Sequence, residues 1–120
     1  MAAPNVGAAT SLYEVTKGYA VTASLAEAHS GATDKLHKIT AIRATNVDGT
    51  NDAWVTVSFY ESATTHRYLA YQINVPANSA LDIITRETPI YVEEGDDIYA
   101  QAQAASDIDL VISYEEYDDA

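Results

Sequence analysis

The stretch AWVTVSFYE, residues 53–61, decides the fold class of this 120-residue chain. Val55, Val57 and Phe59 alternate with polar and larger aromatic residues, so they point to one side of an extended strand. An alternation of period two buries one face of a strand and leaves the other in solvent, as in antiparallel sheets. The stretch therefore predicts a β-strand that lies against a hydrophobic core.

The same alternation recurs in three later stretches, RYLAYQINV (67–75), DIYAQAQA (97–104) and DIDLVISYEE (107–116). Turn-forming residues separate the stretches, in NVDGTNDA (46–53), ESATTH (61–66), VPANSA (75–80) and EEGDD (93–97). Regularly spaced short strands predict an antiparallel β-sandwich, jelly-roll-like, of about eight strands. The alternation places these residues in its core: Val55, Val57, Phe59, Ile73, Val75, Ile98, Leu110 and Ile112.

The first third of the chain is less regular. We expect a flexible N-terminal arm over residues 1–10 and a single domain over residues 11–120. SLYEVT (11–16) and GYAVTASL (18–25) read as strands, and AEAHSGATD (26–34) as a loop. KLHKITAIRATNV (35–47) reads as a strand whose apolar phase slips, which a β-bulge near Lys38 would repair.

The net charge of −12 argues against binding to nucleic acid or to anionic membranes, because both repel an acidic protein. A local basic patch at Lys35, Lys38 and Arg43 remains as an alternative. The chain has no Cys and no apolar run near the ~20 residues that span a bilayer. Its first ten residues lack the features of a secretory signal, so export by that route is not expected.

The carboxylates of EEGDD and of the last strand suggest an acidic active site, a metal site or a solvated rim. The turn around Gly95 favours the solvated rim, although a cation held by Asp48, Asp52, Glu93 or Asp96 stays open. His29, His37 and His66 have no metal-ligand spacing and are expected to be exposed. No catalytic motif occurs, so we expect no catalytic residue, no metal, no cofactor and no enzymatic activity.

Nine Tyr and one Trp are many for so short a chain, and several fall on the faces of strands predicted to be solvated. Tyr and Trp are enriched at protein interfaces. Trp54 and Tyr68 are therefore candidate interface residues, with cross-strand packing as the alternative.

From Leu36 to Glu116 the chain resembles small all-β structural proteins of tailed bacteriophages, in the motifs RATNVDG, VPANSALDI, IYVEEGDDIYAQA and DLVISYEE. The segment from Ser11 to Asp34 departs from that pattern. The resemblance implies a virion protein made in the bacterial host cytoplasm, most simply a head decoration (cement) protein. It also implies a homo-oligomer that binds the major capsid protein or another virion protein, without nucleic acid, membrane or cofactor.

Two other functions remain as alternatives. One is a virion component of the neck, tail or fibre attachment, and the other is a carbohydrate-binding or hydrolytic β-sandwich. For a virion protein, we expect the small residues of the N-terminal arm to contact the partner, among them Ala2, Ala3, Pro4, Asn5 and Val6.

Overall fold

A computed structural model describes residues 12–118 and shows an all-β protein. No helix occurs within that range, and thus none long and apolar enough to cross a membrane. The nine strands are β1 (Leu12–Ala20), β2 (Ala26–Ser30), β3 (Lys35–Asn46), β4 (Ala53–Glu61), β5 (Thr65–Val75), β6 (Ala80–Ile84), β7 (Ile90–Val92), β8 (Asp97–Ala102) and β9 (Ile108–Asp118). The arm residues Ala2, Ala3, Pro4, Asn5 and Val6 lie outside the described range.

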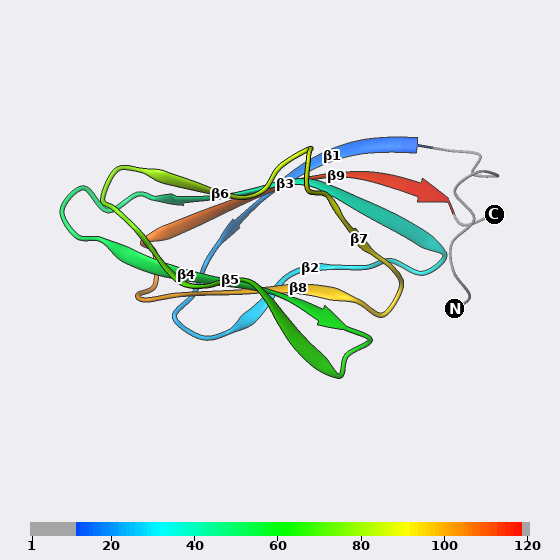
Figure 1. The fold of residues 1–120 in the computed structure, drawn as a ribbon, viewed down its shortest axis with the longest axis horizontal. Coiled ribbons are helices and arrows are strands. Elements are labelled where there is room, and N and C mark those ends of the chain that lie inside the picture. Colours follow the sequence, from blue (N-terminus) through cyan, green and yellow to red (C-terminus); the bar gives the residue numbers. More distant parts are fainter. Residues whose placement is uncertain (1–11, 119–120) are drawn as a thin grey trace.

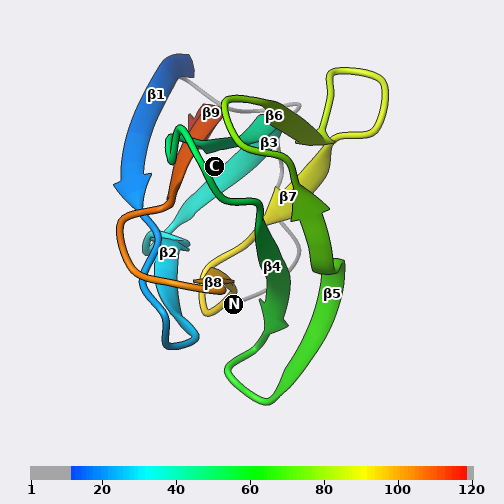
Figure 2. The same cartoon turned by 90° about the vertical axis from the view of Figure 1, so that its left-hand side faces the viewer.

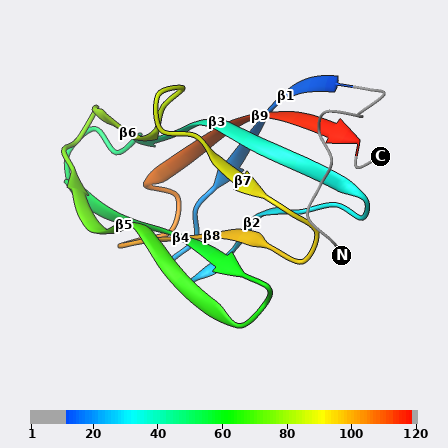
Figure 3. The same ribbon diagram turned by 45° about the vertical axis from the view of Figure 1, so that its right-hand side comes forward.

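The strands form two antiparallel sheets that pack face to face, drawn as the upper and lower layers of Figure 1. The upper sheet has the order β1-β9-β3-β6, with β7 also paired to β3, and the lower sheet has the order β2-β8-β4-β5. The end view in Figure 2 and the intermediate view in Figure 3 show the chain passing repeatedly between the layers. Two interlocked Greek keys of this kind make a jelly roll, so the predicted sandwich is confirmed with nine strands.

The core fills the space between the two layers with aliphatic side chains of β3, β4, β8 and β9. Val55, Val57 and Ile98 are completely buried, and Val75, Leu110 and Ile112 are buried to within 1%. Fully burying one such side chain stabilises the fold by roughly 1.5–3 kcal/mol. These six predicted core residues are confirmed. Phe59 is half-buried and packs against the edge of the core.

The prediction for Ile73 is wrong, because this side chain is 42% exposed. Ile73 pairs with the buried Val55, so it faces inward, but β5 is an edge strand and the other sheet does not cover it there. The same strand contains two β-bulges, so that residues 55–58 of β4 lie opposite residues 68–73 of β5, four residues against six. A positive φ of 47° at Gln72 marks the first bulge. Edge position and bulges together override the alternation in the sequence.

Two further expectations for the first third are corrected. Residues 11–16 and 18–25, expected as two strands, give the single described strand β1, and residues 26–30, expected in a loop, form β2. The apolar residues of AEAHS are only alanines, so the sequence shows no clear alternation, although Ala28 packs against the core. The bulge expected near Lys38 occurs two residues later, between Ile39 and Ala41 in the pairing of β3 with β9.

The core assignment predicts that Val57→Asp unfolds the domain, because the substitution places an unpaired charge where the native side chain has no exposed area. Thermal denaturation followed by circular dichroism measures the effect. A Val57→Asp protein that melts at the temperature of the unchanged protein would contradict the assignment.

Candidate functional site

The acidic turn between β7 and β8 contains a buried carboxylate and is not simply a solvated rim. Asp96 is only 5% exposed. Its Oδ1 accepts a hydrogen bond from the Ser62 backbone N–H at 2.8 Å, and its Oδ2 accepts one from the Glu93 backbone N–H at 3.2 Å. The expectation of a solvated turn is therefore wrong for Asp96. This carboxylate ties the β4–β5 turn, where Ser62 and Ala63 have positive φ, to the β7–β8 turn.

A third turn joins the same cluster through a close backbone approach at Gly31. The Gly31 N–H donates to the Asp96 carbonyl oxygen at 2.9 Å. A Cβ atom at position 31 would lie 2.1 Å from the Glu93 carbonyl oxygen, so only glycine fits. The Asp34 backbone N–H donates a further hydrogen bond to the Glu94 carboxylate at 3.1 Å. Asp96 and Gly31 thus hold three turns together at one end of the sandwich.

Two histidines form a buried pair between β2 and β3. His29 and His37 are each 3% exposed, which corrects the expectation that they are exposed. His29 Nε2 and His37 Nδ1 lie 2.8 Å apart and share a hydrogen bond. The Tyr114 ring of β9 packs on both, with its centre 4.6 Å from each imidazole centre. The pair occupies the inner face, where an apolar residue would ordinarily lie.

The surroundings of the pair fix its proton positions. His37 Nε2 lies 3.6 Å from the Glu116 Oε2 atom, so a proton on that nitrogen faces a carboxylate. We assign the tautomer in which His37 carries its proton on Nε2 and accepts from the His29 Nε2–H. Two buried ring nitrogens then lack a hydrogen-bond partner: the His29 Nδ1 lone pair and the His37 Nε2–H, which faces the Glu116 carboxylate beyond hydrogen-bond distance.

The pair is held neutral in the folded protein. Burial lowers the pKa of His29 from 6.5 to about 4, helped by the charges of His37 and Lys17. Burial also lowers the pKa of His37, against the opposing pull of the Glu116 carboxylate. Charging either ring in this site costs free energy that the unfolded chain does not pay.

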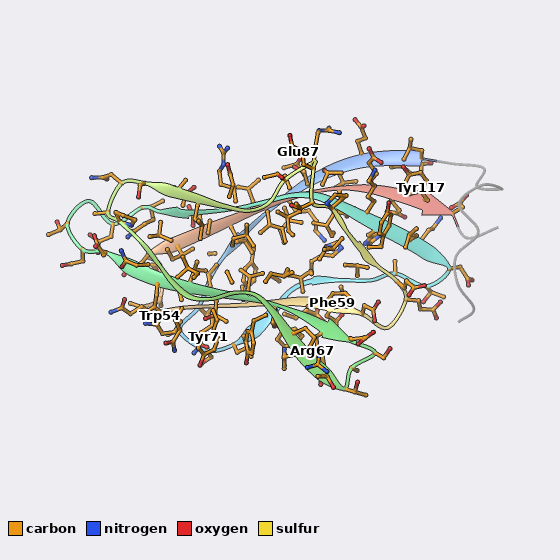
Figure 4. All side chains as sticks on the ribbon, in the orientation of Figure 1. Trp54, Phe59, Arg67, Tyr71, Glu87 and Tyr117 are labelled. Atoms are coloured by element: carbon orange, nitrogen blue, oxygen red, sulfur yellow. The ribbon has the colours of Figure 1, made fainter. Side chains whose placement is uncertain are left out.

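The outer face of the lower sheet carries two groups of rings in contact and one further ring, here named together the outer aromatic surface: Tyr60, His66 and Tyr99, then Tyr68 and Tyr71, and Trp54. The Tyr60 and His66 rings stack at 4.2 Å, and Tyr99 meets both at about 5 Å. Tyr68 and Tyr71 meet edge to face at 4.8 Å. Figure 4 shows Trp54 and Tyr71 on the side of the lower sheet that points away from the upper sheet.

The two candidate interface residues differ in exposure. Tyr68 is 52% exposed, while Trp54 is half-buried beside Asn74 of β5. Tyr71 lies two residues from Ile73, so strict alternation predicts that it faces inward, but it is 58% exposed because the β5 bulge rotates it outward. His66 also differs from expectation, since its Nδ1 bonds the Ser58 hydroxyl at 2.9 Å. Ser58 is fully buried, so this pair cannot present a nucleophile to a substrate.

The remaining polar candidates are engaged within the fold. Asp48 accepts from the Thr50 and Asn51 N–H groups, which lower the pKa of its carboxyl, and Asp52 accepts from the Ala77 N–H. Among residues 12–118 no group of three or more His, Asp or Glu side chains is arranged to hold a metal ion. In the proposed basic patch, Lys35 pairs with Asp118 and Arg43 with Asp82, so two of its three charges are neutralised locally.

A polar hollow of about 330 Å³ lies on the outer face of the upper sheet. Glu14 and Glu115 lie opposite each other on β1 and β9 at its edge, and Arg86 reaches it from the β6–β7 connection. On its floor the Thr16 and Ser113 hydroxyls bond each other at 2.9 Å. The hollow contains no histidine, so it does not pair a histidine base with a hydroxyl nucleophile.

Sequence reasoning missed the buried polar groups because their partners come from distant segments. One signal was available in the sequence. His29 and His37 lie on either side of a short connection that contains Gly31, so they belong to neighbouring elements. Asp96 gave no such signal, because in EEGDD the four carboxylates look equivalent and only the approach of the β4–β5 turn selects one.

Comparison with known proteins gives a fold and no family. No protein-family model and no curated protein matches the chain. Among solved structures, it is similar to a protein of Bacillus endospore appendages, described as a novel family of disulfide-linked pili, with 19% identity and a TM-score of 0.55 over 100% of this chain and 98% of the other. That similarity shows a shared fold alone.

Two structures of a pentameric capsid protein from metagenomic phage sequences are more distant. Both have 13% identity and a TM-score of 0.40 over 86% of this chain, which spans 64% and 60% of their lengths. Similarity at that level is too low to support an assignment.

The role of Asp96 predicts that Asp96→Asn lowers the free energy of unfolding by about 1–3 kcal/mol, because one of two backbone donors then faces an amide NH₂ group. Chemical denaturation measures the change. Glu87→Gln, at an exposed position of the β6–β7 connection, removes the same charge and should stay within about 0.5 kcal/mol. Equal stability of the two variants would show that Asp96 is not an anchor.

The histidine pair predicts acid sensitivity. Both histidines have a lower pKa in the folded protein, so their contribution is complete above pH 6.5 and declines as the pH falls toward 4. For His29 alone the loss by pH 5 is about 2 kcal/mol. Denaturation at pH 7 and pH 5 should therefore show a smaller difference for the double variant His29→Leu/His37→Leu than for the unchanged protein. A double variant that retains the full difference would refute the role of the pair.

Proposed function

We propose that this chain is a structural subunit of a phage virion that acts by binding other proteins and has no enzymatic activity. The observation that carries the proposal is the outer aromatic surface, on which Tyr68 and Tyr71 leave more than half of their surface in solvent. Exposed aromatic rings in contact with one another offer large, rigid area for a protein partner at low entropic cost.

Three further observations support the proposal. The motifs between Leu36 and Glu116 resemble those of small phage structural proteins. The jelly roll is also the fold of the Bacillus pilus protein, a subunit that assembles into a fibre, although this chain has no Cys for disulfide links. The buried polar groups act within the fold: Asp96 bonds a turn, and His66 bonds the Ser58 hydroxyl between neighbouring strands.

Within the virion, a decoration protein of the head fits these features best. Such a protein needs a stiff core, one adhesive face and a remaining surface that keeps crowded copies apart. The net charge of −12 supplies that repulsion and also disfavours contact with packaged DNA. The aromatic surface has a single Trp and five other rings on one sheet face, which would meet the major capsid protein. A neck or tail component would use the same surface with fewer copies.

Quantitative mass spectrometry of purified virions tests the proposal. Hundreds of copies per particle are expected for a head decoration protein, and a dozen or fewer would indicate the neck or tail. Absence of the chain from purified particles would overturn the virion function altogether.

The aromatic surface predicts a second result. Tyr68→Ser/Tyr71→Ser should weaken binding to virions that lack the protein by at least about tenfold, because central aromatic anchors commonly contribute 2 kcal/mol or more. Cosedimentation with particles measures the affinity. Tyr91→Ser is the matched control, because Tyr91 of β7 is equally exposed at 52% but lies on the upper sheet. Equal binding by all variants would exclude the aromatic surface as the contact. Selective binding of a glycan in an array, lost in the double variant, would favour the carbohydrate-binding alternative.

A further inference from the structure

Strand β1 is an open and regular sheet edge. It pairs with β9 on one side in unbroken register from Leu12 to Ala20, and no strand covers its other side within the described range. Seven of its nine residues are exposed and two are half-buried. The backbone N–H and C=O groups on the free side of such an edge are a template for another strand.

The other edge strands are protected from pairing. β5 has two bulges and a left-handed residue at Gln72, and β2 has a bulge between Glu27 and His29. β6 has five residues with a shifted register, and β7 has three. Short length and bulges are the usual devices that prevent edge-to-edge contact. β1 carries neither of them, and it contains no proline.

Gly18 gives an independent indication. Glycine weakens a strand interior and commonly marks a place where another backbone or ligand approaches closely. A Cβ atom at Gly18 would have no neighbour within 4 Å among residues 12–118, so no contact in the described part of the chain requires glycine there. At Gly31, by contrast, the chain itself fills the space. The room beside Gly18 is available to a second chain.

We infer that two copies of this protein pair through β1, antiparallel and about a two-fold axis at Thr16. When a two-fold axis perpendicular to the sheet passes beside one residue, that residue lies opposite its own copy. The numbers of any two opposite residues then add up to twice the number of that residue. The sum of 32 is the register that pairs all nine residues of β1, since Leu12 then meets Ala20 and Thr16 meets its own copy. The two upper sheets become one continuous sheet across the dimer.

The side chains of β1 suit this register. Tyr13 lies opposite the second copy's Tyr19 on the inner face, and the two Thr16 hydroxyls meet on the outer face; both kinds of pair stabilise antiparallel strands. Glu14 lies opposite Gly18, which has no side chain. Lys17 lies opposite Val15, with its Nζ 6.0 Å from the Tyr114 ring centre of its own chain. No like charges face each other.

Charge also favours a second copy as the occupant. β1 contains one Glu and one Lys, so the strand is neutral within a chain of net charge −12. Two strongly acidic proteins repel each other least where both surfaces are locally neutral. When β1 pairs with β1 of a second copy, all nine residues find suitable partners. A strand of another protein would need a complementary sequence of its own.

Single cysteines test both the dimer and its register, because the natural sequence contains none. Opposite residues in an antiparallel pair have Cα atoms about 4.5–5.5 Å apart, within the disulfide range. Thr16→Cys should therefore give a covalent dimer on mild oxidation. Ala20→Cys is the matched control, on the same face and also exposed, but its two copies would lie about 26 Å apart along the strands.

We expect most of the Thr16→Cys protein to cross-link and at least fivefold less of the Ala20→Cys protein. Light scattering of the unchanged protein should show a dimer whose population rises with concentration. Equal cross-linking at the two positions would overturn the register, and a monomer at all concentrations up to about 0.2 mM would overturn the pairing. Both experiments use the isolated protein, so their outcome is independent of whether the chain is found in virions.

Discussion

The pairing of β9 between β1 and β3 is the constraint on which the rest of the structure depends. β9 lies along the whole length of both partners, so the end of the chain joins its beginning to its middle. Contacts between residues so distant in sequence require the intervening chain to lose conformational entropy first. The native sheet is therefore complete only once β9 has paired with both partners. β9 also delivers Tyr114 and Glu116 to the buried histidines and Ser113 to Thr16.

The interior is apolar between the centres of the sheets and polar at one end. There, His29, His37 and Asp96 are buried among turns that carry left-handed residues and a close backbone approach. The two histidines bond each other and Asp96 accepts from two backbone N–H groups, so geometry specifies this end of the sandwich more than hydrophobic area does. The cost of this arrangement is a dependence on pH that an aliphatic end would not have.

The two sheets present different surfaces for contact with other molecules. The lower sheet offers a face, because bulges disrupt the free edge of β5 while aromatic rings cover the outer side. The upper sheet offers an edge, because β1 is regular and its outer side carries the small residues Thr16 and Gly18. The two contacts proposed above, a two-fold edge contact and a separate face contact, would let one small subunit bind a partner and a second copy at the same time, and attachment would then gain from avidity.

The sequence by itself determined the fold class and most of the core, because the period-two alternation in β4, β8 and β9 depends only on neighbours along the chain. It identified Val55, Val57 and Leu110 as core residues and placed the turns that separate the strands. Only the tertiary structure decided the exceptions. Ile73 is exposed because β5 lies at an edge, a position set by the order of strands in the sheet. Asp96 and the histidine pair are buried because segments 34 and 85 residues away, at Ser62 and Tyr114, close over them, and no local pattern reports the approach of a distant segment.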